Sequence, residues 1–219
     1  MNQFPTDIYT EPQTDTAVSA HLGPLAPLAG VWEGTKGVDI NPKENGPEEK
    51  VYIERIDMRF IDPQPNGPQL FYGLRYHIYI HEPESPLTFH DQIGYWLWEP
   101  AEGNLIQTVT IPRGQTAMAV GKAAADAKKF TLRSERGSMT CGIISNPFLE
   151  HAFNTQSYEI TVTVNDDGTW SYEQDTVMII PGYKEPFHHT DHNTLHKIAE
   201  SPLNPGAVFA VENGRVVVR

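Results

Sequence analysis

The amino-acid sequence predicts an all-β protein, built either as a sandwich or as a barrel. Segments rich in β-branched and aromatic residues recur about every ten residues, and clusters of Pro, Gly, Asn and Asp separate them. We count roughly eight to ten such segments, which suits one domain in a chain of 219 residues. Between them no stretch of about twelve residues has the apolar spacing of a helix, which argues against parallel βαβ units.

The predicted β domain covers residues 21–200 and follows an N-terminal arm. Residues 1–20 are polar and lack periodicity, so we expect them to form a flexible arm. Three leucines spaced three apart predict a short helical turn over residues 22–29, and Trp32 opens the first strand. Helix is otherwise expected only around residues 145–152 and 190–200. Further strands are predicted over residues 51–61, 69–82, 89–100, 105–112, 114–125, 129–136, 156–164 and 169–180.

The segment "QLFYGLRYHIYIHE", residues 69–82, alternates most clearly. One face of this strand is apolar and aromatic, with Leu70, Tyr72, Leu74, Tyr76, Ile78 and Ile80. The other face is mixed, with Phe71, Gly73, Arg75, His77, Tyr79 and His81. A barrel interior that holds a ligand would need such a half-polar face, and a solvated outer face would look the same. Both interpretations remain open for this strand.

The C-terminal segment, residues 201–219, is predicted to add a β-hairpin to the domain. Its sequence "AVFAVENGRVVVR" places two short apolar strands around an Asn213-Gly214 turn, the strongest short-range hairpin signal. The hairpin could cover the mouth of a barrel. It could also pair with the hairpin of a second copy, which would give a homodimer.

Charge and cysteine content exclude several classes of function. The formal net charge is −12, and Lys128-Lys129 is the longest basic run, so we expect neither a nucleic-acid partner nor binding to an anionic membrane surface. The single cysteine, Cys141, rules out an internal disulfide and a cysteine-based zinc site. The N-terminus lacks the basic and apolar regions of a secretory signal, and apolar runs are short. A cytoplasmic protein is expected.

Motifs along the chain add a family resemblance. The stretch "LGPLAPLAGVWEG", residues 22–34, has the form L-G-P-L-x-x-L-x-G-x-W-x-G. A Gly-Tyr-Trp strand at residues 94–96, a turn at Gly103 and a Pro-Arg-Gly turn at residues 112–114 follow. A polar strand pair, "YEITVTVNDDGTWSYEQDTVMII", leads to the last histidines. In this combination the chain resembles the nitrobindin family, which includes the C-terminal haem-binding domain of THAP-domain proteins.

The resemblance implies an antiparallel up-and-down barrel of about ten strands, similar to lipocalins and fatty-acid-binding proteins. It also implies haem b in the barrel mouth, held by one histidine, and chemistry on nitric oxide or peroxynitrite, which the family is credited with isomerising to nitrate. In the family this histidine precedes a closing turn, which Asn193-Thr194-Leu195 matches here. His189 is therefore favoured as the axial iron ligand and the metal-binding residue, and His192 is the second candidate.

The histidine-rich stretch "PFHHTDHNTLHKI", residues 186–198, allows two other interpretations. It could be a polar surface cluster. It could also hold a metal directly, because His192 and His196 would share one face of a helix, although no H-E-x-x-H motif is present.

Three further residues are candidate contacts for a bound cofactor. Arg75, His77 and His90 could line a pocket, where cationic side chains would pair with haem propionates. The alternative function is a non-enzymatic binder of a small hydrophobic or carboxylate ligand anchored by Arg75. A barrel that has lost haem binding is a third option.

Overall fold

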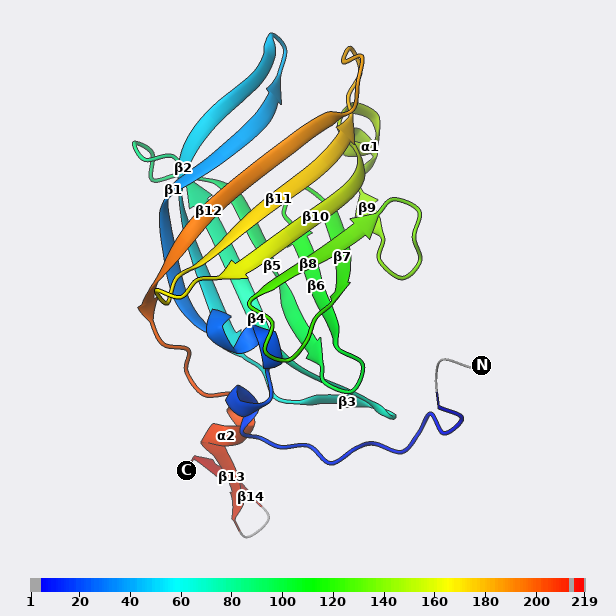
Figure 1. The fold of residues 1–219 in the computed structure, drawn as a ribbon, viewed down its shortest axis with the longest axis vertical. Helices are drawn as coiled ribbons and strands as arrows, with labels where there is room; N and C mark the ends of the chain where they lie inside the picture. The colour runs from blue at the N-terminus through cyan, green and yellow to red at the C-terminus, as the bar shows by residue number, and fades with distance from the viewer. Residues whose placement is uncertain (1–4, 213–214, 219) are drawn as a thin grey trace.

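The computed structural model describes residues 5–212 and 215–218, and ten of its strands close into one antiparallel barrel (Figure 1). Each barrel strand pairs with the next one along the chain, and β12 returns to pair with β1. The predicted up-and-down barrel is therefore confirmed. The barrel strands are β1 (Gly30–Lys43), β2 (Gly46–Phe60), β4 (Gln69–His81), β5 (Thr88–Glu99), β6 (Asn104–Ile111), β7 (Gln115–Lys122), β8 (Lys129–Glu135), β10 (Asn154–Val164), β11 (Trp170–Ile179) and β12 (Phe187–Ala199).

Two short strands lie outside this closed ring. β3 (Gln64–Asn66) pairs only with β4, while β2 pairs directly with β4 to complete the barrel. β9 (Ile143–Ser145) pairs with β7 beside the junction of β7 and β8. That junction is the weakest in the wall, with Val120 opposite Arg133 as its one ladder pair. Because all ten main strands are paired on both sides, the barrel has no long exposed edge.

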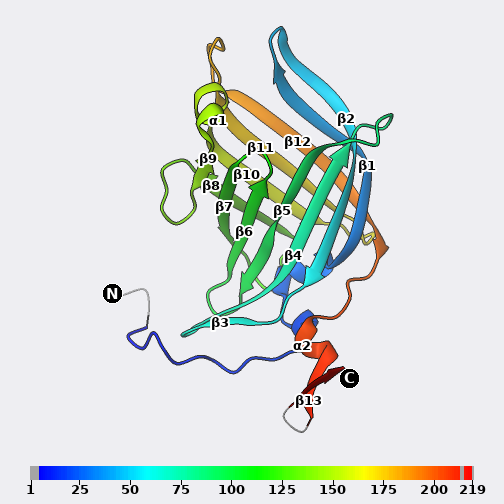
Figure 2. The ribbon, with the colours of Figure 1, turned by 180° about the vertical axis from the view of Figure 1, so that it is seen from behind.

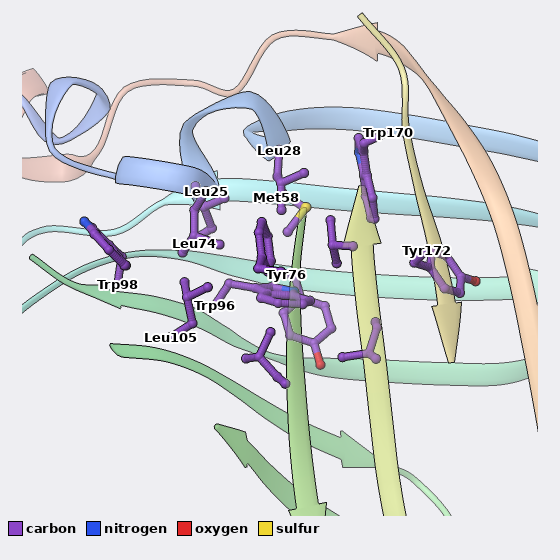
Figure 3. Close-up of a cluster of buried hydrophobic side chains, with 14 of the residues drawn as sticks. Leu25, Leu28, Met58, Leu74, Tyr76, Trp96, Trp98, Leu105, Trp170 and Tyr172 are labelled. Atoms are coloured by element: carbon purple, nitrogen blue, oxygen red, sulfur yellow. The ribbon is translucent and has the colours of Figure 1, made fainter. Parts of the chain in front are cut away.

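Two 3-10 helices plug one end of the barrel. They are η1 (Val18–Ala20) and η2 (Gly23–Leu28), and the second confirms the helical turn predicted at residues 22–29. Leu22, Leu25 and Leu28 are fully buried in the plug, and the indole Nε1 of Trp32 donates a hydrogen bond to the carbonyl of Leu28 at 2.8 Å. Figure 3 shows Leu25 and Leu28 of the plug beside Leu74, Trp96 and Trp98 of the barrel interior. This end is therefore filled by side chains.

The C-terminal extension lies at the plugged end (Figures 1 and 2). After β12 the chain forms α2 (Pro205–Val208) and the paired strands β13 (Phe209–Glu212) and β14 (Arg215–Val218). The predicted turn residues Asn213-Gly214 lie outside the described residues. Asn204 Nδ2 donates to Asp62 Oδ1 at 2.7 Å, which ties the extension to the loop after β2. The extension therefore leaves the opposite, open end of the barrel uncovered.

The remaining helix predictions had different outcomes. Helix α1 (Pro147–Ala152) forms where helix was expected, with Asn146 as its N-cap. The prediction of a helix at residues 190–200 is wrong, because residues 190–199 belong to β12. The strand gains backbone hydrogen bonds from β1 and β11 on its two sides, which outweighs local propensity. Among the described residues no helix is long and apolar enough to cross a membrane.

Candidate functional site

The barrel interior contains a cavity between the plug and the open end. Its volume is about 30 Å³, room for about two water molecules and below the range of small-molecule pockets. Apolar and polar side chains both line it, and Ile78 and Ile80 stand opposite Gln92 and His90 in the ladder between β4 and β5. The lining residues are Glu54, Ile56, Met58, Ile78, Ile80, His90, Gln92, Trp96, Gln107, Ile160, Trp170, Tyr172, Gln174 and Asp191.

The structure brings two of the five predicted site residues to the interior. His90 on β5 lines the cavity, and His189 on β12 lies on the inward-facing side of its strand, with its side chain 33% exposed. His192 is exposed on the outer face of β12, because it is three positions from His189 and strand side chains alternate. It is therefore placed outside the cavity.

Arg75 and His77 also face outward, which corrects their assignment to the ligand pocket. Both are exposed on β4, whereas Tyr76 between them is buried. The mixed face of this strand is thus the solvated outer face, the second of the two interpretations left open by its sequence. His77 Nε2 lies 3.2 Å from Asp91 Oδ2 on that face.

His189 is held at the open end by a carboxylate. Its Nε2 lies 2.6 Å from Oδ1 of Asp39, a buried residue on β1. Burial alone would lower the pKa of His189, but the hydrogen bond and the negative charge of Asp39 outweigh it and raise the pKa above its ordinary value. A carboxylate paired with a histidine is the arrangement that orients metal-binding imidazoles in proteins.

His90 is the neutral histidine of the pair. Burial lowers its pKa, so its imidazole resists protonation. Its Nε2 lies 3.2 Å from Gln92 Oε1, Gln92 Nε2 donates to the Tyr76 hydroxyl at 2.8 Å, and that hydroxyl donates to the carbonyl of Thr108 at 2.8 Å. Because the carbonyl can only accept, every hydrogen bond in this chain has a fixed direction, and His90 must carry its proton on Nε2. Its Nδ1 then keeps a free electron pair.

A second series of hydrogen-bonded side chains crosses the interior, and the sequence analysis did not predict its members Glu54, Tyr52, Tyr172 and Asp191 as site residues. The Tyr172 hydroxyl donates to Glu54 Oε2 at 2.9 Å and lies 2.8 Å from the Tyr52 hydroxyl, which is 3.3 Å from Asp191 Oδ1. The three contacts need three protons, and the two hydroxyls supply two. One of the two carboxyl groups must therefore be protonated for all three contacts to be hydrogen bonds.

The electrostatics of the two acids agree with this proton count. Burial raises the pKa of Glu54 to about 7, although hydrogen bonds from Tyr172 and Asn193 oppose the shift. Burial and the nearby charge of Glu54 raise the pKa of Asp191 to about 8. The sequence carried a signal for Glu54, because it shares the inward face of β2 with Tyr52, Ile56 and Met58. A carboxyl among apolar residues on one strand face indicates a buried polar site.

The comparisons with known proteins place this barrel in a family. Residues 21–197 match the family described as "THAP4-like, heme-binding beta-barrel domain". The chain belongs to this THAP4-like family. The match covers most of the chain and confirms the resemblance indicated by the motifs at its start and middle.

Structural similarity supports the fold of this THAP4-like barrel. The chain is similar to the crystal structure of Rv2717c from M. tuberculosis, with 21% sequence identity and a TM-score of 0.59. The similarity covers 84% of this chain and 99% of that one. No curated protein matches the chain.

The donor set of the THAP4-like barrel suits haem better than a free metal ion. In residues 5–212 and 215–218 no group of three or more His, Cys, Asp or Glu side chains is arranged to hold a metal ion. The metal site considered at His192 and His196 is thus not formed by the described side chains. Haem needs one or two imidazoles beside apolar walls. His189, His90 and the isoleucines of β4 meet that requirement at the open end.

Proposed function

We propose that this THAP4-like barrel binds haem b at its open end, with His189 as the axial iron ligand. The observation that carries the proposal is that His189 and His90 both face the interior at this end, while His192 faces solvent. Asp39 would accept the remaining N–H of His189 and keep its ring oriented. Binding iron requires His189 to lose its second proton, so haem affinity should fall at low pH.

Other residues of the open end would position the group. Ile78 and Ile80 on β4 offer an apolar wall to a flat macrocycle, and His90 lies on a neighbouring strand with a free electron pair. Arg113 donates to the carbonyl of Phe89 at 2.5 Å, next to His90, where its charge could face a propionate. These residues would bind and orient the haem, exclude water from its inner face and keep an uncharged imidazole beside it.

The family resemblance supports nitric oxide or peroxynitrite as the small molecule handled at this site. Bound haem would supply an iron centre for such a ligand. His90 is suited to accept a hydrogen bond at Nδ1 or to donate one at Nε2 after releasing Gln92, and both acids of the interior can store a proton. The chemistry would then be ligand binding or isomerisation at one iron, without electron transfer to a partner.

A hemin titration of the purified protein tests the proposal. We expect a Soret band at one hemin per chain, a changed or lost band in His189→Ala, and an unchanged band in His192→Ala, which removes an exposed imidazole from the same strand. Circular dichroism would show that both variants keep the barrel. Binding of hemin with the wild-type spectrum by His189→Ala would contradict the assignment.

A second candidate function rests on the crowding of the interior. The side chains of Trp96, Trp170 and Tyr172 are buried and line the cavity, whose volume of about 30 Å³ leaves room only for a ligand much smaller than haem. The barrel would then be a non-enzymatic binder of a small polar or hydrophobic molecule. Native mass spectrometry of protein purified without added ligand would reveal such a molecule, and hemin would give no Soret band.

A further inference from the structure

The outer wall of the barrel carries a second hollow, which we call the outer groove. It crosses β2, β4, β5 and β6, and its volume is about 550 Å³. The side chains that matter for its chemistry are Asp57, Arg59, Arg75, His77, Ile93 and Tyr95. None of them lines the interior cavity, so the outer groove is separate from the proposed haem site.

Positive charge is concentrated at the outer groove in an otherwise acidic protein. The net charge is −12, yet Arg55, Arg59 and Arg75, three of the eight arginines, share the outer faces of two adjacent strands. Arg59 stands directly opposite Arg75 in the ladder between β2 and β4. Like charges in directly opposite positions destabilise a sheet, so this pair calls for a compensating anion.

Of the two opposed arginines, Arg59 and Arg75, only Arg59 forms an ion pair with a carboxylate among the described residues. Arg59 Nη2 lies 2.5 Å from Asp57 Oδ2, so this guanidinium has its own carboxylate. Within the described residues Arg75 has no ion pair and no side-chain hydrogen bond, although it is exposed at the groove. Its planar guanidinium is therefore free to bind a carboxylate through two parallel hydrogen bonds.

Apolar surface continues from Arg75 across the floor of the groove. Tyr95 on β5 stands opposite Arg75 and is 44% exposed, and Ile93 stands opposite His77 and is 52% exposed. Between β5 and β6 the ladder is interrupted at Gly94 and Tyr95, and the Tyr95 amide donates to the Thr108 hydroxyl at 2.9 Å. The ring of Tyr95, the side chain of Ile93 and the interrupted ladder between β5 and β6 thus lie beside the guanidinium of Arg75.

We propose that the outer groove binds an organic carboxylate with a flat apolar body. Arg75 pairs with the carboxylate, and Tyr95 and Ile93 contact the apolar body. The anion also relieves the repulsion between Arg59 and Arg75. This site takes its ligand on the outside of the wall, independently of whether haem occupies the interior.

Calorimetric titration with 2-naphthoate tests the proposal, with 2-naphthamide as the uncharged probe of the same shape. We expect 2-naphthoate to bind and Arg75→Gln to weaken its binding at least about tenfold, since a charge-assisted bidentate pair contributes on that scale. Arg133→Gln is the matched control, because Arg133 is also an exposed strand arginine but is paired with Glu135 and Glu159. It should bind 2-naphthoate like the wild type.

Three results would overturn the proposal. One is equal affinity of 2-naphthamide and 2-naphthoate, and another is unchanged 2-naphthoate binding by Arg75→Gln. The third is loss of 2-naphthoate binding in His189→Ala with full binding in Arg75→Gln, which would place the carboxylate inside the barrel. Because Arg75 is exposed and makes no bond within the described residues, Arg75→Gln should fold normally, and its circular dichroism spectrum would verify this.

Discussion

Replacement of Glu54 by glutamine should stabilise the barrel at alkaline pH and have little effect at acidic pH. Glu54 is 1% exposed, and both of its hydrogen bonds, from Tyr172 and Asn193, end on one carboxyl oxygen. Glutamine has nearly the same shape and offers a carbonyl oxygen to the same two donors. The substitution therefore removes a buried charge while keeping the contacts.

The size of the effect follows from the shift in pKa. Burial raises the pKa of Glu54 from 4.5 to about 7. Between these values the folded state binds more protons than the unfolded state, so the stability of the wild type falls as pH rises through this window. A shift of this size corresponds to about 3 kcal/mol, fully lost above pH 7 and still present below pH 4.5.

Urea unfolding of wild type and Glu54→Gln at acidic and alkaline pH measures this difference. We expect Glu54→Gln to gain about 3 kcal/mol relative to wild type near pH 8.5 and almost nothing near pH 4.5. Glu173→Gln, an exposed change next to Tyr172 on β11, should show no such pH dependence. An equal effect of Glu54→Gln at both pH values would refute the reasoning, because the charge of Glu54 would then carry no cost in the folded state.

Two further substitutions probe the histidine pair and the barrel wall. Asp39→Asn removes the negative charge that raises the pKa of His189, so burial should bring that pKa below its ordinary value of 6.5. An NMR titration of the imidazole measures this pKa, and an unchanged value would show that the charge of Asp39 is not the cause. The stability that this pair contributes is present below pH 6.5 and is lost as pH rises through the raised pKa, so Asp39→Asn should cost most stability on the acidic side. Gly94→Ala would drive a Cβ into the carbonyl oxygen of Thr108 and should cost about 1–3 kcal/mol in thermal unfolding, whereas an unchanged melting temperature would mean that β6 moves freely there.

The strands of the barrel were predictable because each one is specified by residues that are close together in the sequence. Alternating strands and turn residues can be read within windows of about ten residues. The Glu54–Tyr172 contact could not be predicted in this way, because its partners are 118 positions apart and meet only when β1, β2, β11 and β12 lie side by side. The orientation of Arg75 was undecided for a related reason, since both faces of β4 carry large side chains and only barrel closure shows which is buried.

The choice between His189 and His192 depends on the period of the segment that carries them. On a helix, residues three or four apart share a face, so His192, three positions from Leu195, would face the same way as Leu195, and His189, six positions away, would not. On a strand the period is two, and Leu195 is fully buried in the core. His189, six positions away, must then face inward with Leu195, while His192, three positions away, must face outward. The strand assignment of residues 187–199 therefore decides by itself which imidazole a ligand inside the barrel could reach.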